Sequence, residues 1–259
     1  MKIDLQNKNA LVCGSSQGIG KACAMTLAKA GANVTLFSRD QAKLEAVLAE
    51  LDTSAGQEHA MLVADFSDPN QVKQALETIP TAFHILVNNT GGPPPGPAHL
   101  ASEADFLNAF HLHLLSNQAL VQHVIPAMKE AGYGRIVNVI STSVKQPIPG
   151  LGVSNTIRGA VASWSKTLAG ELGPFGITVN NVLPGATNTV RLEAIFKNKA
   201  KKLDLSVEEV AEQERATIPL RRFGEAEELA AAVTFLASPQ AAYISGVNLP
   251  VDGGRTQSF

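Results

Sequence analysis

Short apolar runs and amphipathic stretches alternate along this chain. Runs such as Ala10–Cys13 and Asn33–Phe37 have the length of short buried strands. Between them, the stretch Ile19–Ala30 has apolar residues at helical spacing and stops at Gly31. The first forty residues therefore predict a strand, a turn, a helix and a second strand.

The same alternation continues to the end of the chain. We expect strands at 10–13, 33–37, 60–64, 84–87, 135–140, 178–183 and 247–251, and helices at 19–30, 41–51, 69–79, 103–130, 157–172, 192–200, 207–214 and 226–237. Strands that alternate with helices indicate a parallel sheet covered on both faces. The predicted fold class is α/β, a doubly wound parallel sheet of the Rossmann type, in one domain that spans residues 1–259.

Two segments interrupt this pattern, the proline-rich stretch 91–97 and the charged stretch 191–222. Both follow strand ends, where the ligand crevice of a doubly wound sheet lies. They are therefore candidate walls of a substrate site, with 191–222 as a lid. Ordinary surface connections remain the alternative.

Composition excludes several classes of protein. A chain of 259 residues with 45% hydrophobic and 17% charged residues fits one large domain. The net charge is −2 and no long run of one sign stands out except Lys197 to Lys202, so there is no reason to expect a nucleic-acid partner. The polar amino terminus lacks a signal core, and no apolar stretch reaches membrane-spanning length. Cys13 and Cys23 have neither disulfide nor metal-ligand spacing, and His111 and His113 point apart on a helix. We expect a cytoplasmic protein without a metal site or a membrane partner.

The first strand leads into a glycine-rich turn that opens the first helix. Its residues are Gly14, Ser15, Ser16, Gln17, Gly18, Ile19 and Gly20. Glycines allow the backbone to approach a ligand closely, and the amide groups and dipole of a helix amino terminus attract a pyrophosphate. In this context the turn predicts a dinucleotide site.

The turn and several later motifs resemble the short-chain dehydrogenase/reductase family. Gly14-x-x-x-Gly18-x-Gly20 matches the family's T-G-x-x-x-G-x-G pattern, with Cys13 in the place of threonine. The other matching segments are Asn88-Asn89-Thr90-Gly91, Pro184-Gly185, Ser245-Gly246 through Asp252-Gly253-Gly254, and Arg222-Phe223-Gly224 with Glu227-Glu228, the last resembling the 3-oxoacyl-carrier-protein reductase branch. The resemblance covers almost the whole chain and implies a nicotinamide cofactor.

The residues after the second strand indicate which cofactor is bound. An acidic residue there would hold a ribose 2′-hydroxyl, whereas Ser38-Arg39 offers a guanidinium that can hold a 2′-phosphate. NADP(H) is therefore predicted over NAD(H), with a solvated surface arginine as the alternative. The resemblance further implies that Asp65 and Phe66 flank the adenine, that Asn89 and Gly91 flank the adenosine ribose, and that Pro184, Gly185, Thr187 and Thr189 contact the nicotinamide end.

The resemblance breaks at the catalytic positions. Family members use a serine, a tyrosine, a lysine four residues after the tyrosine, and an asparagine in the preceding long helix. Ser141 matches the serine, but Ser154 and Arg158 replace the tyrosine and the lysine, and His113 replaces the asparagine. A serine hydroxyl is too weak an acid to replace an activated phenol, and arginine cannot relay a proton. The two tyrosines of the chain, Tyr133 and Tyr243, are not obvious substitutes.

Three interpretations remain open. In the first, which we favour, the protein is an NADP(H)-dependent oxidoreductase that reduces a carbonyl: Ser141 and Ser154 hold the carbonyl oxygen or a water, Arg158 stabilises negative charge, and His113 or solvent supplies the proton. In the second, the protein binds NADP(H) without turnover, as a sensor or partner subunit. In the third, it transfers hydride to a cationic acceptor. A histidine satisfied inside a helical interface is the competing interpretation of His113.

Substrate and assembly are expectations from the resemblance. It implies a small carbonyl or alcohol substrate, which includes a 3-oxoacyl thioester, and a homotetramer formed through the helices 103–130 and 157–172 and the last strand. The lysines of the 191–222 segment, among them Lys197 and Lys199, would suit an anionic substrate if they line a lid. A solvated helix face explains them equally well.

Overall fold

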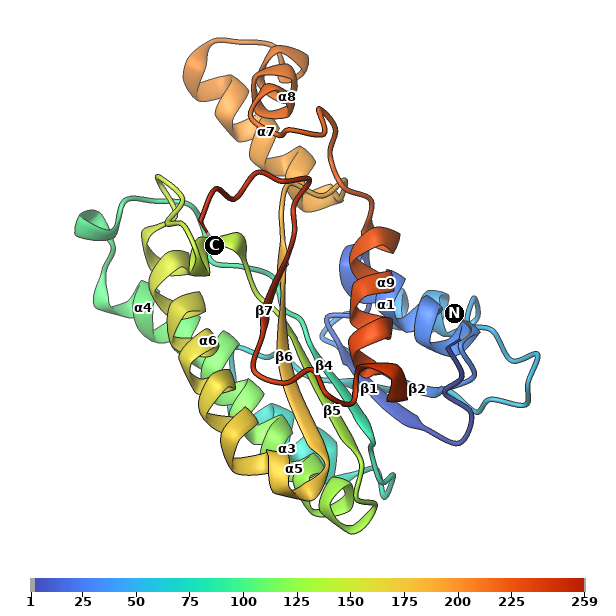
Figure 1. Ribbon diagram of the computed structural model, residues 1–259. Helices are drawn as coiled ribbons and strands as arrows, with labels where there is room; N and C mark the ends of the chain where they lie inside the picture. Colours follow the sequence, from blue (N-terminus) through green and yellow to red (C-terminus); the bar gives the residue numbers. More distant parts are fainter. Residues whose placement is uncertain (1–2, 259) are drawn as a thin grey trace.

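A parallel β-sheet forms the centre of the molecule. The computed structural model describes residues 3–258, and in this part of the chain the sheet has seven strands in the order β3-β2-β1-β4-β5-β6-β7 (Figure 1). All neighbouring strands are parallel. The strands are β1 (Asn9–Cys13), β2 (Asn33–Ser38), β3 (Ala60–Val63), β4 (Ile85–Asn88), β5 (Gly134–Val139), β6 (Ile177–Pro184) and β7 (Asn248–Val251). The predicted doubly wound, single-domain fold is confirmed.

Helices cover both faces of the sheet, as Figure 1 shows. One face carries α1 (Gly18–Lys29), α2 (Gln41–Leu48) and α9 (Ala226–Ala237), and the other carries α3 (Pro69–Glu77), α4 (Glu103–Phe110), α5 (Ser116–Glu130) and α6 (Gly152–Leu172). Successive side chains of a strand point to opposite faces, so Ala10 and Val12 of β1 join one core and Leu11 and Cys13 join the other. Because both faces are buried, the strands are almost continuously apolar.

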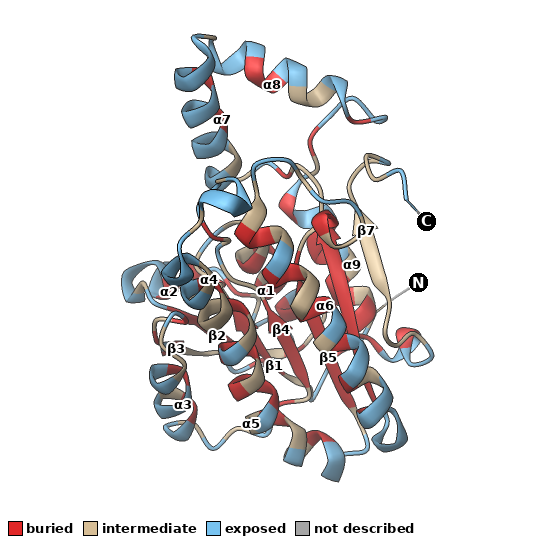
Figure 2. Ribbon diagram, turned by 90° about the vertical axis from the view of Figure 1, so that its left-hand side faces the viewer, coloured by how far each residue is buried: buried red, intermediate tan, exposed pale blue. Residues whose placement is uncertain are grey.

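Two helices project beyond the carboxyl ends of the strands. They are α7 (Val190–Leu203) and α8 (Val207–Ala216), and most of their surface is exposed (Figure 2). A small core of their own, which contains Phe196, Val210 and Phe223, holds them together. The expected helices at 192–200 and 207–214 are therefore present and slightly longer than predicted.

The long helix expected at 103–130 contains an interruption. A π-helical segment, His111–Leu115, separates α4 from α5. The segment contains one extra residue per turn relative to an α-helix, so it shifts the phase of the apolar pattern without breaking the rod. The helix expected at 157–172 begins five residues earlier, at Gly152. Gly150 and Gly152 and the nearby prolines conceal that start, because these residues are typical of loops.

A row of four asparagine side chains, three buried and one half-buried, crosses four strands of the sheet. Asn88, Asn138, Asn181 and Asn248 occupy paired register positions on β4, β5, β6 and β7. Asn138 donates to Asn181 at 3.0 Å and accepts from Asn88 at 2.8 Å, and Asn181 donates to Asn248 at 2.7 Å. We refer to these four residues as the asparagine row. It ties together the strands whose carboxyl ends carry the candidate site.

Across residues 3–258, none of the helices combines the length and the apolar character needed to traverse a lipid bilayer. The cytoplasmic location expected from the sequence stays a prediction.

Candidate functional site

The glycine turn between β1 and α1 is packed too tightly for side chains. A Cβ on Gly14 would lie 2.4 Å from the carbonyl oxygen of Asn89, and one on Gly20 would lie 2.1 Å from the carbonyl oxygen of Gly14. Gly14 and Gly18 have φ values of 60° and 55°, in the left-handed region that favours glycine. The sequence therefore places glycine where the fold requires it.

The amino terminus of α1 leaves its amide groups available for a ligand. The N-cap residue Gln17 makes no side-chain capping hydrogen bond, and the first turn contains no acidic residue. Four amide groups at the start of a helix need partners, and a pyrophosphate is a common one. Ser15 is buried and its Oγ accepts from the Phe37 amide at 2.9 Å, so only its backbone faces the turn. Ser16 and Ile19 are half-buried beside the same helix start.

The second strand ends beside the predicted adenosine region. Arg39 is exposed, and its Nη1 lies 3.6 Å from Oδ2 of Asp65. Hydrogen bonds from Ser67, together with the weaker influence of Arg39, hold the pKa of Asp65 below its usual value. The ring of Phe66 packs against Phe37 in the core, and its carbonyl accepts from Ser116 Oγ at 2.7 Å, so only the Phe66 amide N–H is left to meet an adenine. Ser38 is buried at the strand end.

The loops after β4 and β6 close around the glycine turn. The Asn89 amide lies 3.4 Å from the carbonyl oxygens of Cys13 and Gly14. Thr189 caps α7, and a Cβ on Gly18 would lie 3.3 Å from its Cγ2. Thr187 is buried and donates to the Gly185 carbonyl at 3.1 Å, at the point where Pro184 ends β6. Gly91 is exposed on the loop after β4. Together these contacts show that the structure brings most of the predicted cofactor residues to one edge of the sheet.

Ser141, Ser154 and Arg158 lie near the carboxyl end of β5. Ser141 directly follows that strand region and its Oγ accepts from the Ser143 amide at 3.1 Å. Ser154 and Arg158 lie four residues apart on α6 and are both buried. The Arg158 Nη1 donates to the Val139 carbonyl at 3.0 Å, and its Nε has no hydrogen-bond partner among residues 3–258. Burial, and secondarily the charge of Arg191, lowers the pKa of Arg158 to about 10.

His113 lies inside the π-helical segment and is 1% exposed. Its Nδ1 and the Thr90 Oγ1 share a hydrogen bond of 2.7 Å, whereas its Nε2 has no partner in the described chain. Burial, followed by the charges of Arg158 and Arg191, lowers the pKa of His113 to about 2. One ring nitrogen of the histidine is therefore hydrogen-bonded, and the other is buried without a partner in the described chain.

Arg191 is a site residue that the sequence analysis missed. It lies in the first turn of α7, and its Nη1 donates to the Gly92 carbonyl at 3.0 Å, across 99 positions of sequence. The side chain is exposed, yet its charge acts on both Arg158 and His113. The sequence feature that could have identified Arg191 as a site residue is its position two residues after Thr189, which is itself a predicted cofactor residue.

The lysines of the projecting helices are engaged with neighbouring carboxylates. Lys197 pairs with Glu193 at 2.5 Å, and Lys199 lies 3.9 Å from Glu214. Glu214 also pairs with Arg255 of the carboxyl-terminal segment at 2.6 Å. These contacts favour the interpretation of the lysines as a solvated helix face.

Other chemistry-bearing groups lie away from this site. Tyr133 precedes β5, at the strand end opposite Ser141, and donates to the Ala237 carbonyl, while Tyr243 is fully exposed. Burial raises the pKa of the Cys13 thiol well above its usual value and that of Cys23 to about 12, so neither is a reactive thiolate. Residues 3–258 contain no cluster of histidine, cysteine and acidic side chains suited to a metal ion.

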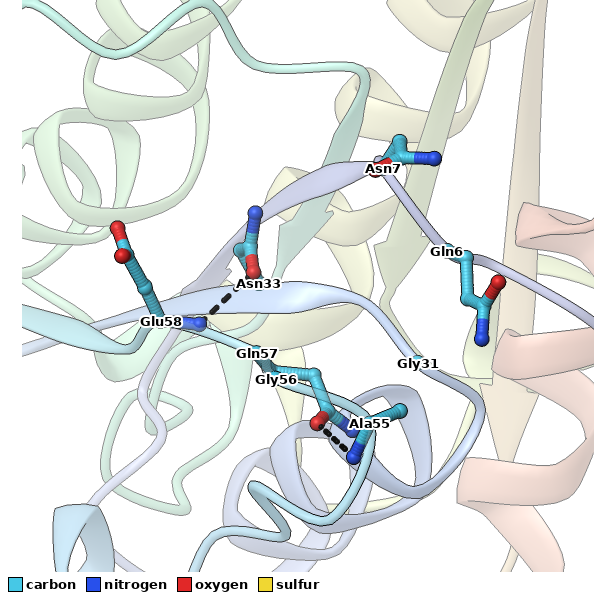
Figure 3. A pocket seen from close by; sticks show the side chains of 8 residues that line it. All are labelled: Gln6, Asn7, Gly31, Asn33, Ala55, Gly56, Gln57 and Glu58. Carbon is cyan, nitrogen blue, oxygen red and sulfur yellow. Dashed lines mark hydrogen bonds between the residues drawn. The ribbon is translucent and has the colours of Figure 1, made fainter.

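A polar hollow lies at the amino ends of the strands, opposite the candidate site. Its lining residues are Gln6, Asn7, Gly31, Asn33, Ala55, Gly56, Gln57 and Glu58 (Figure 3). The Glu58 amide donates to Asn33 at 2.9 Å, and the Ala55 amide donates to Gln57 at 2.8 Å. These groups satisfy one another and close a surface loop. Ligands of doubly wound sheets bind at the carboxyl ends of the strands instead.

Comparison with known proteins agrees with this arrangement. Residues 14–256 match the family model described as enoyl-(acyl carrier protein) reductase. The chain is 30% identical to the NADPH-dependent reductase BacG of Bacillus subtilis, over 98% of this chain and 100% of that protein. It is 32% identical to the 3-oxoacyl-[acyl-carrier-protein] reductase FabG of Staphylococcus epidermidis, over 96% and 98%.

The fold also matches solved structures along its full length. L-sorbose reductase from Gluconobacter frateurii, complexed with NADPH and L-sorbose, superposes with a TM-score of 0.93 at 28% identity, with 100% of both chains covered. The chain therefore belongs to the short-chain dehydrogenase/reductase family, and the resemblance seen in its sequence is confirmed.

Proposed function

We propose that the protein is an NADP(H)-dependent oxidoreductase that reduces a carbonyl compound through an atypical catalytic site. The glycine turn and the uncapped start of α1 would hold the pyrophosphate, and Arg39 would hold the 2′-phosphate. Thr187 and Thr189 border the nicotinamide region. The NADPH-dependence of BacG and the NADPH in the L-sorbose reductase complex support this choice of cofactor.

Bound NADPH supplies a hydride to the carbonyl carbon. The chain must then hold the carbonyl oxygen and stabilise the negative charge that develops on it. We assign the first task to Ser141 and Ser154, and the second to Arg158. Arg158 stays protonated at neutral pH even with its pKa lowered to about 10, and a preorganised donor in a partly dry site stabilises an oxyanion strongly.

The proton is assigned to solvent. With a pKa of about 2, His113 is neutral at working pH and holds no acidic proton of the kind that a general acid donates. Its Nε2 is also buried, so this nitrogen is not placed to meet a substrate oxygen. Water therefore protonates the oxygen to give the alcohol, and the released hydroxide is taken up by the buffer.

One observation carries this proposal: the buried Arg158 makes a single hydrogen bond, from Nη1 to the Val139 carbonyl, and its Nε and Nη2 have no partner among residues 3–258. A buried charged group with unpaired donors is costly, and a substrate oxygen bound at Nη2 would offset part of that cost. The substrate class implied by the family resemblance is a 3-oxoacyl-like carbonyl compound, and the FabG relative supports it.

Cofactor titration followed by a carbonyl panel tests the proposal. NADPH should bind, at least one ketone should be reduced, and Arg158→Met should lower kcat by about 100-fold or more. Arg158→Lys keeps the charge and should retain part of the rate. NADPH affinity should change less than about threefold in both variants. Tight binding of NADPH without turnover of any ketone would instead favour a sensor or partner subunit.

The lid and the assembly belong to the same proposal. We assign residues 191–222 to a substrate-side lid because α7 and α8 stand over the carboxyl ends of the strands.

We assign a homotetramer because β7 is an edge strand with half-exposed residues and the nearby Tyr243 is fully exposed. Light scattering should give the mass of four 27.2-kDa chains, and Tyr243→Glu should lower it.

A further inference from the structure

Arg158 and Arg191 form an uncompensated positive pair at the candidate site. Neither guanidinium forms an ion pair with a carboxylate of residues 3–258, and each donates one hydrogen bond, to a backbone carbonyl. Four other arginines do pair with carboxylates: Arg39, Arg215, Arg222 and Arg255. Arg221 also lacks a carboxylate partner, but it is exposed and donates to the Ala216 carbonyl. Arg158 and Arg191 differ from it because both contact the chain at the carboxyl ends of the strands.

A second buried arginine shows how this chain satisfies such a group when its role is structural. Arg135 is 3% exposed, donates three hydrogen bonds to backbone carbonyls, and stacks over the Tyr133 ring at 4.1 Å. Arg158 is almost as buried, at 7% exposed, but donates only once. Neither its Nε nor its Nη2 has a hydrogen-bond partner within the described residues, and of the two only Nε is completely buried, which leaves Nη2 as the nitrogen that a ligand can reach.

The surroundings of the pair add no negative charge. The His113 ring is neutral, with its Nδ1 hydrogen-bonded to the Thr90 hydroxyl and its Nε2 buried without a partner in the described chain. Arg191 also lies in the first turn of α7, where the helix dipole is positive and a cation is unfavourable. An arginine at that point is explained by a negative ligand more readily than by helix stability.

We propose that the substrate is an oxo acid, whose carboxylate is held by Arg191 while its carbonyl oxygen accepts from Nη2 of Arg158. This inference rests on the proposed carbonyl reduction and replaces the 3-oxoacyl thioester implied by the resemblance with a free oxo acid. A carboxylate neutralises the exposed arginine in the ground state, and the oxyanion neutralises the buried one as hydride arrives. Two contacts fix the position of the Arg191 guanidinium. Its Nη1 donates to the Gly92 carbonyl, and its Nη2 lies so close to Gly92 that an added Cβ would be 2.5 Å away.

Matched acids and esters test the inference by binding alone. Pyruvate, acetoacetate and levulinate, which separate the carbonyl and carboxylate by increasing distances, would each be titrated into the NADP⁺-loaded protein beside its methyl ester. We expect at least one acid to bind about tenfold or more tightly than its ester, as loss of a charged hydrogen bond requires. Equal affinity for every acid and ester would overturn the inference.

Arg191→Met and Lys201→Met provide the variant and its control. Both remove one positive charge from α7, but Lys201 is exposed and makes none of the Arg191 contacts at the site. Arg191→Met should abolish the preference for acid over ester, Arg191→Lys should keep part of it, and Lys201→Met should leave it intact. NADPH affinity should stay within about threefold in each. If Arg191→Met weakens NADPH instead and leaves the acid preference, Arg191 belongs to the cofactor site and the inference is wrong.

Turnover distinguishes this inference from the proposed function. If acids bind preferentially but no carbonyl compound is reduced, the anion site stands and the reductase proposal fails. If ketones and esters are reduced as well as acids, the reductase proposal stands and the oxo-acid inference fails. Faster reduction of acetoacetyl-CoA than of acetoacetate, unchanged in Arg191→Met, would assign a thioester and overturn the oxo acid.

Discussion

Thr90 Oγ1 lies 2.7 Å from Nδ1 of His113. The contact joins the loop after β4 to the π-helical segment and fixes the ring in a site that almost excludes water. Both its burial and the two nearby arginines oppose protonation of the ring, in that order. Two measurable consequences follow for the dependence of this protein on pH.

The first consequence concerns stability. The pKa of His113 falls from 6.5 to about 2 on folding, so below about pH 6.5 the unfolded chain binds a proton that the folded chain does not. The free energy of unfolding should therefore fall as the pH falls from about 6.5 towards 2. Between pH 7 and pH 5 this histidine alone contributes a loss of about 2 kcal/mol.

Urea unfolding at both pH values, compared between the wild type and His113→Gln, isolates this contribution. His84 and His123, whose pKa values are also lowered by burial, remain in both proteins and cancel in the comparison. The wild type should lose more stability than the variant. An equal loss in the two proteins would show that His113 does not titrate as described.

The second consequence concerns the reaction rate. With His113 neutral and Arg158 charged, neither group changes its protonation between about pH 4 and pH 8. We expect kcat/KM for carbonyl reduction, measured from loss of NADPH absorbance, to stay within about twofold between about pH 5.5 and pH 8. A cationic His113 acting as the acid predicts a rate that falls steadily above its pKa, and that profile would restore its catalytic assignment.

The cofactor preference should depend on Arg39. The 2′-phosphate is the only chemical difference between NADPH and NADH, and the exposed guanidinium of Arg39 is free to move from Asp65 onto it. Arg39→Ala should raise the dissociation constant of NADPH about tenfold or more and leave that of NADH almost unchanged. Lys43→Ala removes a nearby cation that pairs with Asp40 at 2.9 Å, and it should change neither constant.

The glycine turn offers a test with a matched control. Gly18 and Gly132 have φ values of 55° and 58°, so alanine strains both positions similarly. Only Gly18 lies in the turn, 3.3 Å from Thr189 when a Cβ is added, while Gly132 faces open space. Gly18→Ala should weaken NADPH binding at least about tenfold. Calorimetry should detect no such change in Gly132→Ala, and a similar loss in both would assign the effect to strain.

The asparagine row should be costly to interrupt. Asn138 bonds to Asn88, Asn181 and Ser165, and alanine at this position would leave several buried polar groups unpaired. We expect Asn138→Ala to lower the free energy of unfolding by about 2–4 kcal/mol. Asn70→Ala on the exposed surface of α3 should cost less than about 0.5 kcal/mol. Similar values for the two variants in urea unfolding would contradict a structural role for the row.

The fold was readable from the sequence because its signals are local. Apolar runs, helical spacing and the glycines at 14, 18 and 20 act within a few residues of each other, and each predicted strand is present. The boundaries were less accurate: the start of α6 was placed five residues late, because the contacts of Gly152 with Ala98 come from a distant loop.

Only part of the candidate site could be predicted from the sequence, because the remaining contacts join residues that are far apart along the chain. Spacing along the chain aligned Ser141, Ser154, Arg158 and His113 with family positions, and their catalytic roles stay proposals. Arg191 could not be found in this way, because its partner Gly92 and its influence on Arg158 depend on tertiary structure. The positive charges of the 191–222 segment made its lysines candidates for binding an anionic substrate. Only the fold shows that Lys197 and Lys199 lie beside carboxylates.

The π-helical segment lets the two halves of the helix between Glu103 and Glu130, α4 and α5, turn their apolar faces in different directions. One inserted residue turns everything after it by about 100° around the helix axis. Residues of α4 thereby pack against the start of α6, while α5 packs against the sheet. Deleting a single residue between His111 and Leu115 would restore a continuous α-helix that cannot satisfy both interfaces. Such a deletion would also break the contact between His113 and Thr90, so the number of residues in this segment fixes the position of the histidine.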